Sequence, residues 1–178
     1  VGVITFDDRE FRHATDDILA PSIKQAGHPV EVQYLRSQDS QTAAQDISSA
    51  ILHFRQDQVT HVVFLGSGGA LPLLFLNAAQ DQNYFPRYSF TSQDVIEALV
   101  QNYLTNPGQQ LRGAVGVGWL PIIDLNAGDP QFKPNAADQR CLQILSAGGQ
   151  APSGSNATAG AFFYCDMFWF MRAAINAV

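Results

Sequence analysis

The stretch 59–70, which reads VTHVVFLGSGGA, constrains the fold more than any other part of the chain. Its Val-Val-Phe-Leu run shows no polar alternation, which is typical of a strand buried on both faces of a parallel sheet. Gly-Ser-Gly-Gly then lets the backbone turn sharply before a helical pattern resumes at Leu71. In open α/β sheets such turns lie at the carboxyl edge, where ligands bind. We therefore expect the functional site at that edge.

The same strand-and-helix alternation runs through the first two thirds of the chain. The connections are short enough for right-handed crossovers, which place the strands in one parallel sheet. We predict a three-layer α/β sandwich with a mainly parallel, five-stranded, Rossmann-like sheet. The predicted strands are 1–6, 30–35, the apolar run that begins at 59, 87–91 and 111–119, and the predicted helices are 11–26, one that follows Asp39, 71–80 and 93–104.

Single residues mark where several of these helices begin or bend. Pro21 falls inside the first helical pattern and predicts either a kink or two abutting short helices. Ser37 and Asp39 are candidate caps of the second helix, and Ser92 is the expected N-cap of the helix at 93–104. The second helix should bury one apolar stripe, formed by Ala43, Ile47, Ala50, Ile51 and Phe54.

The rest of the chain departs from this rhythm, so we divide it into a ligand-binding lobe at 1–125 and a helical segment at 126–178. The segment should contain helices at 135–147 and 158–178 and pack on the lobe or on a part outside this sequence. The last helix is aromatic nearly all round and carries Asp166 and Arg172, which favours burial in protein over lipid. Left uncovered, its Phe and Trp side chains would favour self-association.

Composition excludes some classes of partner. Hydrophobic residues make up 46% of the chain and charged residues 15%, as in folded globular proteins. The net charge is −6 and no basic cluster occurs, which argues against nucleic acid or an anionic membrane surface as a partner. Because the chain opens at Val1, already inside a predicted strand, we interpret it as a piece of a longer protein whose targeting sequence was lost.

Cys141 and Cys165 are the only two cysteines. Two buried free thiols and a disulfide are alternatives that the residues themselves leave open. As a hypothesis we predict the disulfide, which would tie the last two helices together and imply an oxidising compartment. Two cysteines without nearby histidines do not predict a structural zinc site.

Acidic side chains follow the first predicted strand at Asp7 and Asp8. Such a pair invites comparison with phospho-acceptor receiver domains, but the third strand ends in Gly66 with no aspartate, and Trp119 ends the fifth with no lysine. The receiver interpretation therefore fails. The aspartates either cap the first helix or contact a ligand.

Ser67 sits on a strand-to-helix turn, like the nucleophile of an α/β-hydrolase. All four histidines precede it, whereas the hydrolase order places the histidine last, so no such triad forms. Leu71 stands where a dinucleotide fingerprint needs Gly or Ala, and no Walker lysine follows, so we predict no cofactor. A helix N-terminus suited to a carboxylate or another small anion remains. Trp119 is either core or a wall against which a ligand packs.

Several motifs together resemble a known family. They are Asp-Asp-Arg-Glu-Phe at 7–11, His-Val-Val-Phe-Leu-Gly at 61–66, Tyr-Phe-Pro-Arg-Tyr at 84–88 and Gly-Val-Gly-Trp-Leu-Pro at 116–121. In this order they resemble the second lobe of type I periplasmic solute-binding proteins, most of all the branched-chain amino acid receptors of ABC transporters. The stretch 158–178 resembles the helix that follows the family's crossing back to the first lobe.

The resemblance implies a receptor lobe without catalysis. It would clamp a small polar solute such as an amino acid, work with the membrane permease of an ABC transporter, and lie outside the cell or in the periplasm, anchored through a missing N-terminal part. The first lobe and the return strands fall outside this sequence. The alternatives are a hydrolase that uses Asp7 or Asp8 as base, and a sensory domain on the same sheet. The implied ligand-binding residues are Phe6, Asp7, Asp8, Phe11, Ser67, Gly68, Thr91, Ser92 and Trp119.

Overall fold

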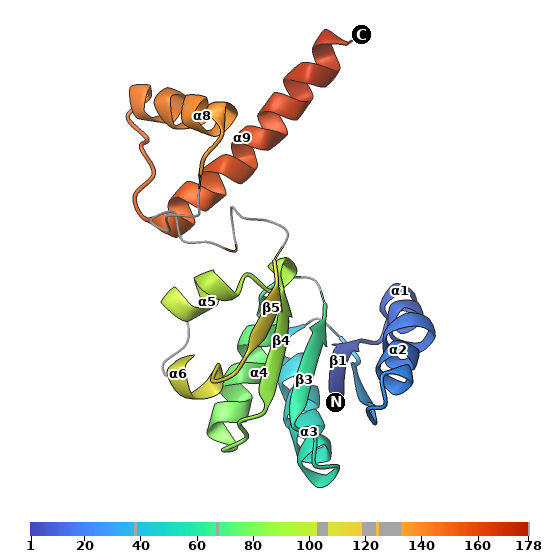
Figure 1. The fold of residues 1–178 in the computed structure, drawn as a ribbon. Helices are drawn as coiled ribbons and strands as arrows, with labels where there is room; N and C mark the ends of the chain where they lie inside the picture. Colours follow the sequence, from blue (N-terminus) through green and yellow to red (C-terminus); the bar gives the residue numbers. More distant parts are fainter. Residues whose placement is uncertain (38, 67, 103–106, 119–123, 125–132, 178) are drawn as a thin grey trace. The chain divides into compact units, whose positions relative to one another are not determined.

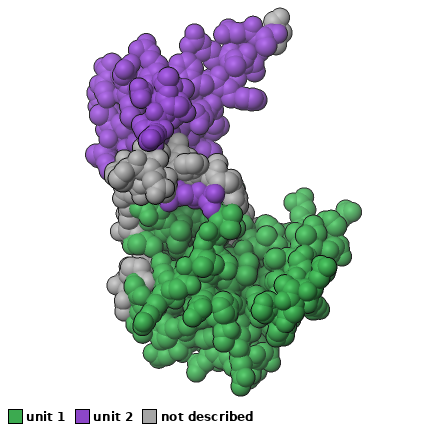
Figure 2. All heavy atoms as spheres, in the orientation of Figure 1, with its two compact units in different colours: residues 1–117 green, residues 118–178 purple. Residues whose placement is uncertain are grey.

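A computed structural model describes residues 1–37, 39–66, 68–102, 107–118, 124 and 133–177. The chain forms two compact units, residues 1–117 and 118–178, which are coloured separately in Figure 2. Each unit is described below by itself. The boundary expected after residue 125 falls outside the described residues and stays a prediction.

The first unit is built on a five-stranded parallel sheet with the strand order β2-β1-β3-β4-β5 (Figure 1). Val3 of β1 pairs with Val32 on one side and with Val63 on the other, and Ser89 pairs with Val115 at the far edge. The predicted fold class is therefore confirmed. The strands are β1 Gly2–Phe6, β2 Glu31–Leu35, β3 His61–Leu65, β4 Arg87–Thr91 and β5 Val115–Val117.

Helices cover both faces of this sheet. Right-handed crossovers place the helical run between β1 and β2 on one face and the helices after β2 and β3 on the other. Figure 1 shows the first run beside β1, apart from α3 and α4. The first run is α1 Arg9–His13, η1 Ala14–Leu19 and α2 Ala20–Gln25; the later helices are α3 Ser40–Gln56, α4 Ala70–Asp81, the 3₁₀ turn η2 Ser92–Asp94, α5 Ile96–Asn102 and α6 Pro107–Gln110.

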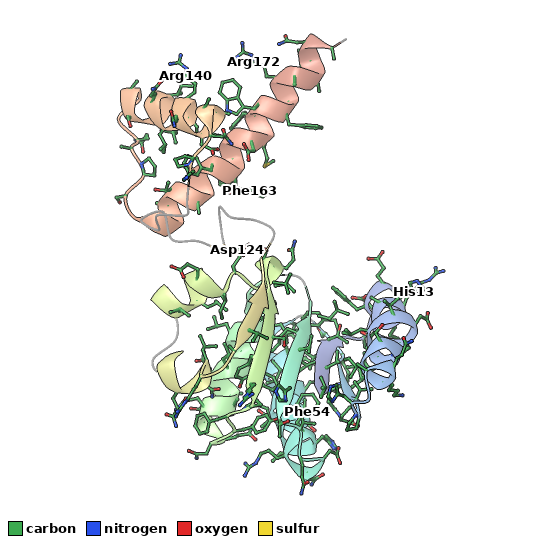
Figure 3. The ribbon with its side chains drawn as sticks, in the orientation of Figure 1. His13, Phe54, Asp124, Arg140, Phe163 and Arg172 are labelled. Carbon is green, nitrogen blue, oxygen red and sulfur yellow. A yellow bond between two sulfur atoms is a disulfide. The ribbon has the colours of Figure 1, made fainter. Side chains whose placement is uncertain are left out.

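The core lies between the sheet and the α3–α4 pair. The ring of Phe64 packs edge-on against Phe75 at 5.4 Å between centroids and stacks with Phe90 at 5.6 Å. All five residues of the stripe predicted for α3 are buried, among them Phe54, which is labelled in Figure 3. Asp39 caps α3 by accepting hydrogen bonds from two backbone N–H groups, as predicted.

The first helical run has neither a simple kink nor a break at Pro21. It contains a π-helical segment, in which the N–H of Ala20 donates to the carbonyl of Thr15, five residues back. Proline has no N–H, and its ring crowds the carbonyl four residues earlier, here that of Asp17. A widened turn directly before Pro21 relieves this crowding while the helix continues. Gly27, at φ +84°, ends the run.

Two expectations near β4 and β5 are wrong. Thr91, not Ser92, is the N-cap after β4, and it caps a short 3₁₀ turn before α5 begins at Ile96. Within the described residues 107–118, the fifth strand covers Val115–Val117, whereas a strand over 111–119 was expected. The chain turns just before it, since Gly113 has φ +74° and the N–H of Ala114 donates to the carbonyl of Leu111.

Between residues 133 and 177, the second unit contains two helices, α8 Ala136–Ala147 and α9 Ser155–Asn176. Asn135 caps α8 in a capping box with Asp138. A disulfide joins Cys141 to Cys165 with 6.1 Å between Cα atoms, which confirms the predicted bond between the last two helices. In the described part of the chain, no helix combines the length and apolarity that a membrane crossing needs.

Candidate ligand-binding edge

The predicted site residues that the structure describes lie at the carboxyl ends of three neighbouring strands, β1, β3 and β4. The strand order reverses between β1 and β3, because the chain leaves β1 toward one edge of the sheet and leaves β3 toward the other. In open α/β sheets the loops diverge at such a point and leave a crevice in which ligands bind. Ser67 and Trp119 fall outside the described residues and stay predictions.

Asp7, directly after β1, is exposed and forms an ion pair with Arg12. The hydrogen bond from Arg12 is the main reason why the pKa of Asp7 lies below its usual value. The Asp7 N–H donates to the carbonyl of Leu35 at 2.7 Å, which ties the turn to the end of β2. Asp7 therefore presents a fixed, ionised carboxylate at the edge.

Arg12 is itself held in place by the neighbouring strand. Its guanidinium lies over the ring of Tyr34, 4.1 Å from the centroid, and the Tyr34 hydroxyl donates to Asp16. Burial, followed by the bond to Asp16, raises the pKa of Tyr34 to about 12, so the phenol stays neutral. The sequence patterns do not predict Arg12, Tyr34 or Asp16 as site residues. The one local signal for the ion pair is that Arg12 lies about one helical turn after the acidic residues that follow β1.

Asp8 caps the first helix. Its Oδ1 accepts a hydrogen bond of 3.0 Å from the N–H of Phe11, so of the two alternatives for this aspartate the structure contains the cap. Phe11 in turn packs against Phe6, with 6.1 Å between ring centroids. Phe6 is buried, and Phe11, which lies on α1, is half-buried. Ligand contact by these three residues stays a prediction.

The glycine-rich turn after β3 is shaped by close contacts. Gly68 has φ +77°, a conformation that favours glycine. A Cβ on Gly69 would lie 2.5 Å from Cγ2 of Val95 and 3.1 Å from the carbonyl oxygen of Asp94. Gly69 is also the N-cap of α4 and offers no side chain to the first N–H groups of that helix. Such groups suit a carboxylate from a ligand.

The end of β4 holds a buried carboxylate that we had not predicted. Asp94 is only 3% exposed, and its Oδ2 accepts hydrogen bonds from the backbone N–H and the hydroxyl of Thr91. Burial is the largest influence and raises the pKa of Asp94 above its usual value. The sequence pattern Thr-x-x-Asp at 91–94 was the signal, because it is a capping box. Ser92, which we expected at the site, is buried.

The edge is open. Asp7 is exposed, and Gly68 and Thr91 are half-buried. A hollow of about 740 Å³ in the same unit lies at the opposite end of the strands, where Val1, Pro29, Thr60 and His61 line it. Among the described residues, no three His, Cys, Asp or Glu side chains come together as metal ligands would. The described part of this edge, which we call the shelf, is therefore accessible to solvent.

Comparison with known proteins adds no relative: no protein-family model, curated protein or solved structure matches the chain. The functional argument therefore depends on the fold and on the chemistry of this edge.

Proposed function

We propose that residues 1–117 are one lobe of a two-lobed receptor that binds a small zwitterionic solute, such as an amino acid, without transforming it. The observation that carries this proposal is the pairing of two opposite features at the switch point. Asp7 follows β1 and is held ionised by Arg12, while the N-terminus of α4, whose N-cap Gly69 has no side chain, follows β3, the adjacent strand.

Neighbouring parallel strands lie about 4.8 Å apart, so both features can contact one small molecule. Asp7 would accept hydrogen bonds from an ammonium group, and the first N–H groups of α4 would donate to a carboxylate. Phe11 and Thr91 would line the shelf on either side. A second lobe closing over the edge would exclude water and supply the remaining contacts.

The hydrolase alternative has weaker support. A general base works best with a pKa near the working pH, but Arg12 lowers the pKa of Asp7, and Asp8 is occupied as a helix cap. Asp94 is a carboxyl group at this edge with a raised pKa, and its Oδ2 is occupied by Thr91. A sensory domain would use the same shelf in the same way.

The disulfide is in keeping with an oxidising compartment. We therefore place the proposed receptor outside the cell or in the periplasm, where it would deliver its solute to a membrane permease of the ABC type. This placement follows from the resemblance to solute receptors together with the bond between the last two helices.

The test is a thermal-shift screen of the chain against amino acids, small carboxylates, sugars, nucleosides and polyamines. A ligand at a hundred times its dissociation constant adds about 2.7 kcal/mol of stability. We expect hits among amino acids that Asp7→Asn removes, while the matched change Asp57→Asn, at the opposite end of the strands, leaves them intact. Consumption of a compound, or hits lost in Asp57→Asn and kept in Asp7→Asn, would contradict the proposal.

A further inference from the structure

The outer face of α9 is apolar and exposed. A disulfide from Cys165 to Cys141 joins one side of α9 to α8. Residues two apart in a helix, such as Phe163 and Cys165, point about 200° apart, so Phe163 lies on the opposite side. Phe163 and Arg172 mark the two halves of α9 in Figure 3. The exposed large apolar side chains of α9 are Phe163, Tyr164, Met167, Phe168, Phe170, Met171 and Ile175.

Part of this face forms a seam with coiled-coil spacing. Its positions follow one another in alternating steps of three and four residues, the repeat that keeps two helices in continuous contact. The seam carries no charge: Arg172 lies off it, with its guanidinium 5.5 Å from the centroid of the Trp169 ring. A Cβ on Gly160 would meet nothing within 4 Å, so another helix can approach closely there. The seam residues are Gly160, Phe163, Met167, Phe170, Ala174 and Ala177.

When the seam is aligned with a second copy of itself that runs in the opposite direction, its large residues fall opposite small or flexible ones. We propose that the seam binds the same seam of a second copy of the chain, antiparallel and about a two-fold axis. Met167 then meets Phe170 of the second copy, and Phe163 meets Ala174, so each bulky ring faces a smaller or flexible side chain. A parallel pair would instead stack Phe163 and Phe170 each on its own copy and leave gaps at Ala174.

The exposed area is large enough for a stable pair. Phe163, Met167 and Phe170 on the seam, with Tyr164 and Met171 flanking it, offer on the order of 100 Å² each. That is roughly 500 Å² per copy, so a pair would bury about 1,000 Å² in total, the lower limit for a specific interface. A two-fold interface requires a surface that complements itself. Binding to a different polypeptide would not require the seam to be complementary to a second, reversed copy of itself.

The first experiment measures the mass of the 178-residue chain by sedimentation equilibrium up to about 100 µM. We expect an approach to twice 19.4 kDa, and a return to 19.4 kDa in Phe163→Asp/Phe170→Asp. Phe168→Asp, on the same helix but off the seam, should keep the dimer, and circular dichroism should show that each variant is folded. A monomer at every concentration, a mass that grows without limit, or a dimer that survives the double change would overturn the proposal.

The second experiment determines the direction of the pair. Phe163→Cys/Ala174→Cys should cross-link two copies on mild oxidation. Ala174→Cys alone should not, because in the antiparallel pair its two copies lie about 16 Å apart along the axes. Cross-linking by the single change would show a parallel pair and overturn the proposed geometry.

Discussion

Asp94 accepts two hydrogen bonds from Thr91 through a single oxygen, Oδ2, at 2.7 Å from the backbone N–H and 3.1 Å from the hydroxyl. This pair closes the turn after β4, and the same turn meets the glycine-rich turn after β3 where Gly69 faces Val95. The ends of β3 and β4, two of the three strand ends at the candidate site, are thus packed together. A change at Asp94 or Gly69 should therefore alter the stability of the first unit.

Replacing Asp94 with Ala should destabilise the first unit by about 1–3 kcal/mol, because it removes the cap and leaves the Thr91 N–H without its acceptor. Asp94→Asn keeps an oxygen at the same place and should lose less. Urea unfolding followed by circular dichroism measures both. Equal losses in the two variants would show that the hydrogen bonds to Thr91 are not the source of the effect.

Asp94 should also contribute an unusual pH dependence. Burial raises its pKa in the folded state above the value of 3.8 for an exposed aspartate, so the folded protein holds this proton more tightly than the unfolded chain. Above the pKa that Asp94 has in the folded protein, its ionisation lowers the free energy of unfolding. This loss is recovered as the pH falls toward 3.8. The free energy of unfolding of the wild type, minus that of Asp94→Asn, should increase as the pH falls; a decrease would contradict the assignment.

Asp46 should show the opposite dependence. It accepts hydrogen bonds from the backbone N–H of Arg36 at 2.9 Å and from its Nε at 3.0 Å, which joins the end of β2 to α3. The side-chain bond to Arg36 is the main cause that lowers the pKa of Asp46 below 3.8. Its contribution is present above 3.8 and is lost as the pH falls through the folded pKa. Asp46→Asn should be destabilising at pH 7 and match the wild type in strong acid, as unfolding titrations at several pH values can check.

Gly69→Ala should destabilise the first unit by about 1–3 kcal/mol, since the added methyl group would overlap Val95 and press on the Asp94 carbonyl. Gly108→Ala is the matched control, because a Cβ there meets nothing within 4 Å and Gly108 lies within α6. The control should be neutral or slightly stabilising. Thermal melts of the two variants decide the point, and equal melting temperatures would refute the predicted overlap.

Removing the disulfide with Cys141→Ser/Cys165→Ser should destabilise the second unit by roughly 3 kcal/mol, the entropy expected for a closed loop of this length. The two cysteines are 24 residues apart and join α8 to α9. Melting curves with and without reductant should show the same loss in the wild type. Thiol counting in denaturant, before any reduction, provides the check: two reactive thiols would mean that the bond does not form.

Local patterns determined much of this protein. The buried run before Gly66 predicted a parallel sheet, 87–91 was predicted as a strand with the bounds that β4 has, and the apolar spacing in α3 predicted all five residues of its buried stripe. Asp39 was recognised as a cap, and the disulfide was one of two open alternatives. These features depend on neighbours one to four residues away, or on a cysteine pair, and both can be read from the chain.

Tertiary structure decided the features that depend on distant residues. Arg12 is held by Tyr34, 22 residues later, and only the pairing of β1 with β2 brings them together. Burial of Asp94 and the outer exposure of Phe170 likewise depend on what packs beside each residue. The sequence alone predicted most of the segments that become strands and helices, because backbone preference and side-chain periodicity are local, but not the extent of β5 or the start of α5. Charge partners, pKa shifts and exposed faces were decided by tertiary structure, because burial and electrostatics act between residues that only folding makes neighbours.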